Sequence, residues 1–269
     1  LKIEEIYEAE VIGLENEGKG VCKVGGIIVF VPKTLKGEKI RFRVTEIKKN
    51  FAKGKLVQVL KESDKRVKPS CPYYEECGGC NLRHQEMKEN LKFKKEKIEN
   101  ALKRIGKIDK KVEDVIPSFK NDNYRNKISL KVEDDKIGFY GEGTYQLIDI
   151  DNCLLAVNEI NEAIKVIRTY IKGFKNKIKT VTIKYGNAMD DILIDIYSLS
   201  QDDVGIINYL TSNISNLKTV IFNDKVIFGT GYIKEISNGL MFNCSSKSFF
   251  QVNGMQAEKM YDEAIKLAK

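Results

Sequence analysis

The first part of the chain alternates apolar and polar residues over short stretches that glycines separate. Residues 40–47 carry an apolar side chain at every second position for most of their length: Ile40, Phe42, Val44 and Ile47. Arg41, Arg43 and Thr45 lie between them, and this period of two is typical of a half-buried strand with basic residues facing solvent. Residues 1–61 are therefore predicted to form a small, OB-like β-barrel, an architecture that often binds single-stranded nucleic acid.

Helical periodicity begins only later in the chain. Between Gln85 and Ile105, apolar residues recur at helical spacing and a glycine follows as the stop: Met87, Leu91, Ile98, Leu102, Ile105 and Gly106. From Gln256 a second run places small and apolar residues on one helical face: Ala257, Met260, Tyr261, Ala264 and Ala268. This run stops without a glycine or asparagine cap, so we expect the sequence to be cut within a longer protein.

The middle of the chain mixes both periodicities. Strand-like stretches at residues 128–132, 181–185, 191–197 and 220–222 alternate with helical patterns such as residues 158–171. The fold class expected is α+β and multidomain, because 269 residues exceed one typical core. The predicted domains are a barrel (1–61), a linker with a cysteine loop and a helix (62–111), a central α/β domain (112–247), and the beginning of a further domain (248–269).

Charge and hydropathy narrow the class of protein. Lys and Arg number 46 against 38 Asp and Glu, a net charge of +8, which suits a negatively charged partner. No apolar run reaches the ~18 residues of a membrane span, and the first ten residues lack the layout of a signal peptide. We therefore expect a cytoplasmic protein without a membrane partner, present as a monomer.

Three cysteines carry the strongest chemical motif. Cys71, Cys77 and Cys80 are spaced C-x5-C-x2-C, and two glycines between the last two allow a tight loop around a metal. Three thiolates leave one ligand position open. His84 would complete a Cys3His zinc finger, whereas Cys153 would complete a four-thiolate site for a [4Fe-4S] cluster, and spacing alone does not choose between them.

The two remaining cysteines lie in a different setting. Cys22 and Cys244 have strand-like neighbours and no nearby cysteine, so they are predicted to be ordinary thiols of the core or surface.

Four segments together resemble one family. They are EAEVIGLENEGKGVCKVGGIIVFVPKTLKGEKI at residues 8–40, CPYYEECGGCNLRHQ at 71–85, NYRNK at 123–127 and SFFQVN at 248–253. In this order they are similar to the uracil-C5 RNA methyltransferases that carry an N-terminal TRAM domain and a [4Fe-4S] cluster, and in particular to those acting on 23S ribosomal RNA. The resemblance spans nearly the whole chain.

The resemblance implies a set of roles. Cys153 becomes the fourth cluster ligand, in place of His84. Gln251 corresponds to a glutamine lining the cofactor and substrate pocket, and Phe249 is its aromatic neighbour on the substrate side. Tyr124, Arg125 and Lys127 are candidates for RNA contact, by stacking and by phosphate binding.

The implied activity is methyl transfer from S-adenosylmethionine to C5 of a uridine in 23S rRNA, with tRNA as a possible second substrate. Residues 112–247 would then be the RNA-recognition domain, and residues 248–269 would begin a Rossmann-like methyltransferase domain. No catalytic nucleophile or base can be named in this chain, so the chain alone is expected to bind RNA and not to methylate it. The alternatives are a non-enzymatic RNA-binding protein with a Cys3His zinc finger, and an electron-transfer module without RNA affinity.

Overall fold

The computed structural model describes residues 1–174, 177–200 and 204–268. The chain forms two compact units: Leu1–Tyr74 with Cys80–Pro117, and Glu75–Gly79 with Ser118–Lys269. The α+β, multidomain fold class expected from the sequence is confirmed. The predicted division into four domains is finer than the two units and stays a prediction, and its last residue, Lys269, lies outside the described residues.

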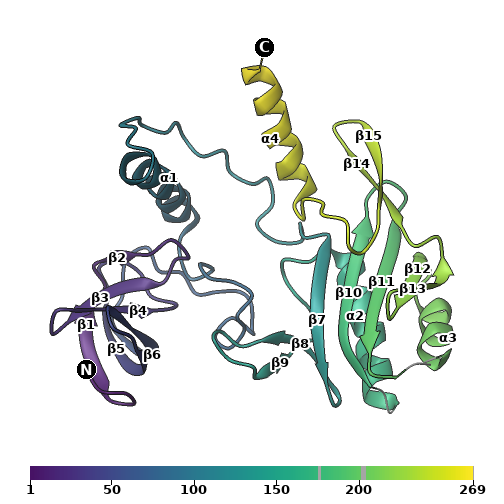
Figure 1. Cartoon of the computed structure of the whole chain (residues 1–269), viewed down its shortest axis with the longest axis horizontal. Coiled ribbons are helices and arrows are strands. Elements are labelled where there is room, and N and C mark those ends of the chain that lie inside the picture. The colour runs from purple at the N-terminus through teal and green to yellow at the C-terminus, as the bar shows by residue number, and fades with distance from the viewer. Residues whose placement is uncertain (175–176, 201–203, 269) are drawn as a thin grey trace. The chain divides into compact units, whose positions relative to one another are not determined.

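The first unit is built on a six-stranded sheet (Figure 1). Its strands are β1 (Ile6–Glu10), β2 (Gly13–Leu14), β3 (Gly20–Val24), β4 (Ile27–Val31), β5 (Lys39–Ile47) and β6 (Phe51–Lys61). They follow the order β1-β5-β6-β4-β3-β2, and only the β4–β6 pair is parallel. Because β1 also lies against β3, the sheet curls into the expected barrel.

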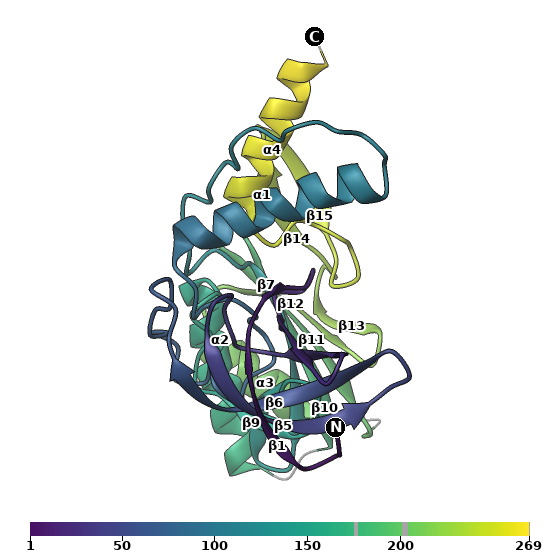
Figure 2. The ribbon, with the colours of Figure 1, turned by 90° about the vertical axis from the view of Figure 1, so that its left-hand side faces the viewer.

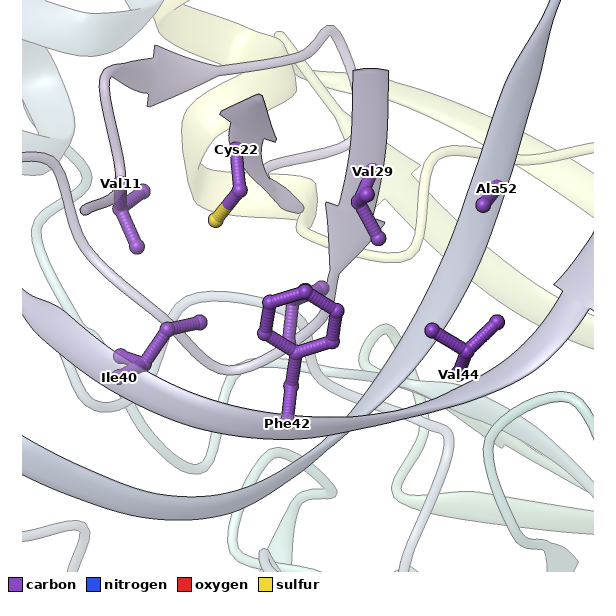
Figure 3. Close-up of a cluster of buried hydrophobic side chains, with 8 residues drawn as sticks. Val11, Cys22, Val29, Ile40, Phe42, Val44 and Ala52 are labelled. Carbon is purple, nitrogen blue, oxygen red and sulfur yellow. The ribbon is translucent and has the colours of Figure 1, made fainter. Parts of the chain in front are cut away.

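The barrel core confirms the alternating pattern of β5. Ile40, Phe42 and Val44 are fully buried and point toward Cys22 and other buried side chains from the opposing strands (Figure 3). Opposite the Phe42 ring lies Gly54, where an added Cβ would come within 2.6 Å of the ring. A glycine at this position of β6 therefore lets the largest core side chain fit.

Two features of β5 differ from the simple pattern. Ile47, three residues after Val44, breaks the period of two; the register shift between Val44 and Glu46 pairs it with fully buried Ala52, and at the end of the strand it is still 36% exposed. On the outer face, the Arg41 guanidinium lies 2.7 Å from Glu8 on β1, and that of Arg43 lies 3.3 Å from Glu4. The basic side chains predicted to face solvent do so, but with acidic partners that reduce their net charge.

The segment after the barrel is held by a bidentate ion pair. Arg66 donates to both carboxylate oxygens of the fully buried Glu38, at 2.6 and 2.8 Å, and to the carbonyl of Lys33. Arg66 also pairs with Gln85, so the two ends of the cysteine segment lie side by side at the barrel. The predicted helix follows as α1 (Met87–Arg104).

The second unit is a seven-stranded sheet in the order β13-β12-β11-β10-β7-β8-β9. Its strands are β7 (Lys127–Glu133), β8 (Lys136–Tyr140), β9 (Leu147–Asp149), β10 (Ile178–Gly186), β11 (Asp191–Ser198), β12 (Leu217–Phe222) and β13 (Lys225–Gly229). Two helices, α2 (Asn158–Gly173) and α3 (Val204–Asn213), lie against each other and against this sheet (Figure 1). The four predicted strands and the helix at 158–171 are thus confirmed.

A hairpin and a last helix complete the second unit. The strands β14 (Ile233–Ser237) and β15 (Leu240–Cys244) are joined by Asn238 and Gly239, both with positive φ, as a tight hairpin turn requires. The Asn238 amide donates to Asp262 of α4 (Gly254–Leu267) at 2.7 Å, so the hairpin lies beside the helix in both views (Figures 1 and 2). Among the described residues, no helix is long and apolar enough to cross a membrane.

Candidate nucleic-acid interface and cysteine sites

Two of the motifs singled out in the sequence meet in the second unit. The main-chain N–H of Asn126, in NYRNK, donates to the carbonyl of Val252, in SFFQVN, at 3.0 Å. The Lys127 ammonium donates to the carbonyl of Ser246 at 2.6 Å, across 119 residues of sequence. Folding therefore brings the two motifs together at the start of β7.

The aromatic residues of SFFQVN have opposite environments. Phe249 is 85% exposed. Phe250 is half-buried, with its ring centroid 5.6 Å from that of Phe242 and 5.7 Å from the Lys184 ammonium. Gln251 is half-buried beside them. The chain thus anchors Phe250 and presents Phe249 to solvent, where a base can stack on it.

Tyr124 and Arg125 are fixed through their main chains. Both N–H groups donate to the carbonyl of Leu155, at 3.0 and 2.7 Å, and the carbonyl of Arg125 accepts from Val157. The Nε of Arg125 is buried and has no hydrogen-bond partner within the described residues. Burial, and then the charge of Lys184, lower the pKa of Lys127. The structure therefore gathers cationic side chains at this edge, and the buried Nε of Arg125 does not itself face solvent.

Three further residues of this region were not predicted as site residues. Lys184 on β10 and Glu235 on β14 are each 1% exposed, with Nζ and Oε1 3.2 Å apart. The Asn126 side chain donates to the other oxygen of Glu235 at 2.6 Å. Burial raises the pKa of Glu235, against the opposing attraction of Lys184. In the sequence, only the position of Lys184 within an apolar strand indicated a buried charge. Its partner, Glu235, could not be identified because it lies far away in the sequence.

The predicted cluster ligands are distributed over both units. Cys71 and Cys80 belong to the first unit, whereas Cys77 and Cys153 belong to the second. All six cysteines are thiols and none forms a disulfide. Over the described ranges, no three His, Cys, Asp or Glu side chains are grouped closely enough to hold a metal ion. The four-cysteine site stays a prediction.

The surroundings of Cys77 are nevertheless suited to a metal ligand. The N–H of Gly79 donates to the Cys77 sulfur at 3.4 Å, a type of bond that tunes metal-bound thiolates. The N–H of Gly78 donates to the Tyr140 carbonyl at 3.0 Å, and a Cβ on Gly78 would lie only 3.0 Å from that oxygen. Glycine at this position lets the loop pack closely on the end of β8.

Cys153 is held through its main chain by α2. The Asn161 amide accepts from the N–H of Cys153 at 2.9 Å and donates to its carbonyl at 3.2 Å. Arg168, two turns further along the same helix, binds both carboxylate oxygens of Asp149 and the carbonyl of Ile150. The loop carrying Cys153 is therefore fixed on both sides, and Cys153 is half-buried.

His84, the other candidate ligand, is engaged elsewhere. Its side chain is fully buried, and its Nδ1 lies 2.5 Å from the hydroxyl of Tyr74. Burial, and then the charge of Arg66, lower the pKa of His84 to about 4, against a smaller opposing effect of the Thr34 main chain. His84 is thus a neutral, buried side chain of the first unit, and its Nδ1 is hydrogen-bonded to the hydroxyl of Tyr74.

Cys22 and Cys244 are both buried, in the barrel core and at the end of β15 respectively. Burial raises the pKa of Cys22 to about 11 and also raises that of Cys244. Both are therefore buried thiols, which agrees with the prediction of ordinary cysteines in the core or on the surface.

Comparison with known proteins places these features in a family context. Residues 2–57 match the TRAM domain family. An RNA methyltransferase of Caldanaerobacter subterraneus is 34% identical over 100% of this chain and 66% of its own length. A second, from Clostridium acetobutylicum, is 32% identical over 97% of this chain and 64% of its own length.

A solved structure has the same fold. The crystal structure of Pyrococcus abyssi tRNA (uracil-54, C5)-methyltransferase in complex with S-adenosyl-L-homocysteine superimposes with a TM-score of 0.75 and 24% identity, covering 97% of this chain and 65% of that one. The chain thus spans 64 to 66% of the length of the curated relatives compared above. From the TRAM domain and these relatives, we conclude that the chain belongs to the family of TRAM-containing RNA methyltransferases.

Proposed function

We propose that this chain is the RNA-recognition part of an enzyme that transfers a methyl group from S-adenosylmethionine to C5 of a uridine in 23S rRNA. The observation that carries the proposal is the junction of NYRNK and SFFQVN, where exposed Phe249 lies on a segment held beside Arg125 and Lys127. Cationic groups there attract the phosphate backbone, and an exposed aromatic ring stacks on an unpaired base. Gln251, on the same segment, is the proposed contact for cofactor and substrate.

Uridine as the target follows from the motifs and from the similarity in fold. The Pyrococcus abyssi protein is a tRNA (uracil-54, C5)-methyltransferase, so tRNA is the main competing substrate. C5 methylation requires the target base to leave its stack, and the exposed ring of Phe249 supports the proposal because such a ring can replace the lost stacking. S-adenosylmethionine supplies the methyl group when bound.

The test uses the gene in its source organism. Deleting it should remove 5-methyluridine from a 23S rRNA fragment, as measured by mass spectrometry of RNase digests, and the intact gene should restore it. Loss from tRNA alone would refute the 23S assignment but keep the reaction. Unchanged 5-methyluridine in both RNAs would refute the proposed reaction.

The same proposal assigns Cys71, Cys77, Cys80 and Cys153 to a [4Fe-4S] cluster. Four thiols are the donor set that such clusters use, and the N–H···S bond to Cys77 and the fixed main chain of Cys153 suit ligand roles. When bound, the cluster would supply iron–thiolate bonds that cross-link the cysteine loop at residues 71–80 to Cys153, a structural role. Gly79 and Asn161 would orient the proposed ligands Cys77 and Cys153, respectively.

Metal analysis tests this assignment. The anaerobically purified chain should be brown and hold about four irons, as one cubane requires. Cys153→Ser should lose the iron, whereas His84→Ala should keep it if the protein folds. Stoichiometric zinc that depends on His84 would support the Cys3His alternative instead.

A further inference from the structure

The buried ion pair Lys184–Glu235 is the feature of the second unit that the proposed function does not use. Both side chains are 1% exposed, and the 3.2 Å contact does not have the orientation of a hydrogen bond, so it acts mainly through charge. Removing two charges from water costs free energy that their attraction often fails to recover. Two apolar side chains of similar volume often stabilise such a position at least as well. We therefore expect a role of Lys184 and Glu235 other than stability.

The pair is connected to one short segment of main chain. Glu235 accepts from the side chain of Asn126 at 2.6 Å, and the main-chain N–H of Asn126 donates to Val252 at 3.0 Å. The carbonyl of Asn126 accepts from Tyr185, the neighbour of Lys184 on β10. One asparagine thus links the buried carboxylate to the end of SFFQVN.

The start and the middle of the segment are held from the same side. Lys127, next to Asn126, donates to the carbonyl of Ser246, and the Lys184 ammonium lies 5.7 Å from the centre of the Phe250 ring. Residues 246 and 250 therefore contact the side chains of Lys127 and Lys184, and residue 252 contacts the main chain of Asn126, whereas Phe249 is 85% exposed. Two of these anchors act through main-chain carbonyls and one through the Phe250 ring, which leaves the side chains of Phe249 and Gln251 free of them.

The geometry points to Glu235 as a positioning residue: held between Lys184 and Asn126, it orders residues 246–252 so that Phe249 and Gln251 face the RNA. The role in RNA binding rests on the proposed function, whereas the ordering of the segment does not. Directional hydrogen bonds to a buried carboxylate fix one conformation, which apolar packing of the same volume does not do.

The decisive variant replaces both charges by apolar side chains. Lys184→Met/Glu235→Leu removes the buried charges together, so its melting temperature should lie close to that of the parent protein. Amide hydrogen exchange of residues 246–252 should nevertheless become about tenfold faster or more, since their anchor is lost. Affinity for a uridine-containing single-stranded RNA should fall about tenfold, which corresponds to ~1.4 kcal/mol.

Asn126→Ala is the second variant, because it keeps the ion pair and removes only the link to the segment. It should also speed exchange at residues 246–252 and weaken RNA binding. Ile164→Ala is the matched control: it makes a cavity under α2, far along the chain from the segment, and lowers the melting temperature without touching the pair. Exchange of 246–252 and RNA affinity should stay at parent values in this control.

The outcomes separate the two proposals. If the double variant and Asn126→Ala keep parent exchange rates in residues 246–252, the positioning role is refuted. If Ile164→Ala loosens the segment as much as they do, the effect is one of general stability and the inference also fails. Should the parent chain not bind RNA at all, the proposed function fails, while the exchange experiment still decides whether Glu235 orders the segment.

Discussion

The N–H of Asn126 donates to the carbonyl of Val252 and so joins, at 3.0 Å, two motifs that lie at opposite ends of the second unit's sequence. One motif brings Arg125 and Lys127, and the other brings Phe249 and Gln251. A single main-chain contact thus places cationic, aromatic and amide groups at one edge of the unit. This combination is what recognition of an unpaired base in RNA requires.

Phe249→Ala should weaken RNA binding without lowering stability. The ring is 85% exposed, so little apolar burial is lost in the folded chain, whereas a stacked base is worth ~1–3 kcal/mol. We expect unchanged thermal melting and a drop in affinity of about fivefold to a hundredfold, measured by fluorescence anisotropy at fixed salt. Phe250→Ala is the control, because its ring packs on Phe242 and its loss should lower the melting temperature. Equal RNA affinity of Phe249→Ala and the parent protein would contradict the stacking role.

The first unit should lose stability in mild acid through His84. Its folded-state pKa is about 4, below the ordinary 6.5, so between these values the unfolded chain binds a proton that the folded chain does not. Stability is therefore complete above pH 6.5 and falls as the pH drops toward 4, by up to ~3 kcal/mol. Urea unfolding followed across this range measures the effect. His84 is the chain's one histidine, so His84→Gln should flatten the profile between pH 5 and 7; a slope that persists in this variant would assign the effect to other groups.

Asn161→Ala should weaken iron retention. The Asn161 side chain holds both the N–H and the carbonyl of Cys153, so its loss frees the main chain that presents this proposed ligand. We expect faster loss of iron to a chelator, by about tenfold, with iron content measured after timed incubation. Asn158→Ala, at an exposed position of the same helix, is the matched control and should retain iron as the parent does. If both variants release iron equally fast, Asn161 has no role in holding Cys153.

Gly78→Ala should detach the loop around Cys77 from the second unit. The new Cβ would lie 3.0 Å from the Tyr140 carbonyl and 3.1 Å from the main chain of Glu142, and main-chain atoms cannot move aside easily. We expect a cost of ~1–3 kcal/mol in local stability, seen as faster amide exchange of residues 75–79. Gly79→Ala should be tolerated, because its Cβ would meet only the Cys77 sulfur at 3.4 Å. Slow exchange in Gly78→Ala would show that the loop accommodates the methyl group.

Local patterns predicted much of the fold. The alternation of Ile40, Phe42 and Val44 predicted a barrel strand, because a period of two is typical of strands with one buried face. Helical spacing predicted the ends of α1 and α2 to within two residues. Ile47 breaks the period of two, and only the register shift against a second strand, β6, pairs it with buried Ala52. Such a shift is set by pairing between strands and leaves no mark in the sequence of one of them.

The candidate site was predictable only in part, for a related reason. The motifs drew attention to Arg125, Lys127, Phe249 and Gln251, but not to Lys184 or Glu235. A lysine inside an apolar strand can be buried only if a partner compensates its charge. That partner is reached through the fold, 51 residues later in a hairpin. The contact between the Asn161 side chain and the main chain of Cys153 also depends on the fold, and no local pattern predicts it.

The anchored SFFQVN segment also has a thermodynamic consequence. A loop that orders only when RNA arrives loses conformational entropy at that moment, on the order of 1–2 kcal/mol for each residue fixed. In this protein the contacts of Ser246, Phe250 and Val252 already restrict the segment in the unliganded chain. The entropy is then lost during folding, and the binding free energy of a base on Phe249 is reduced far less by ordering.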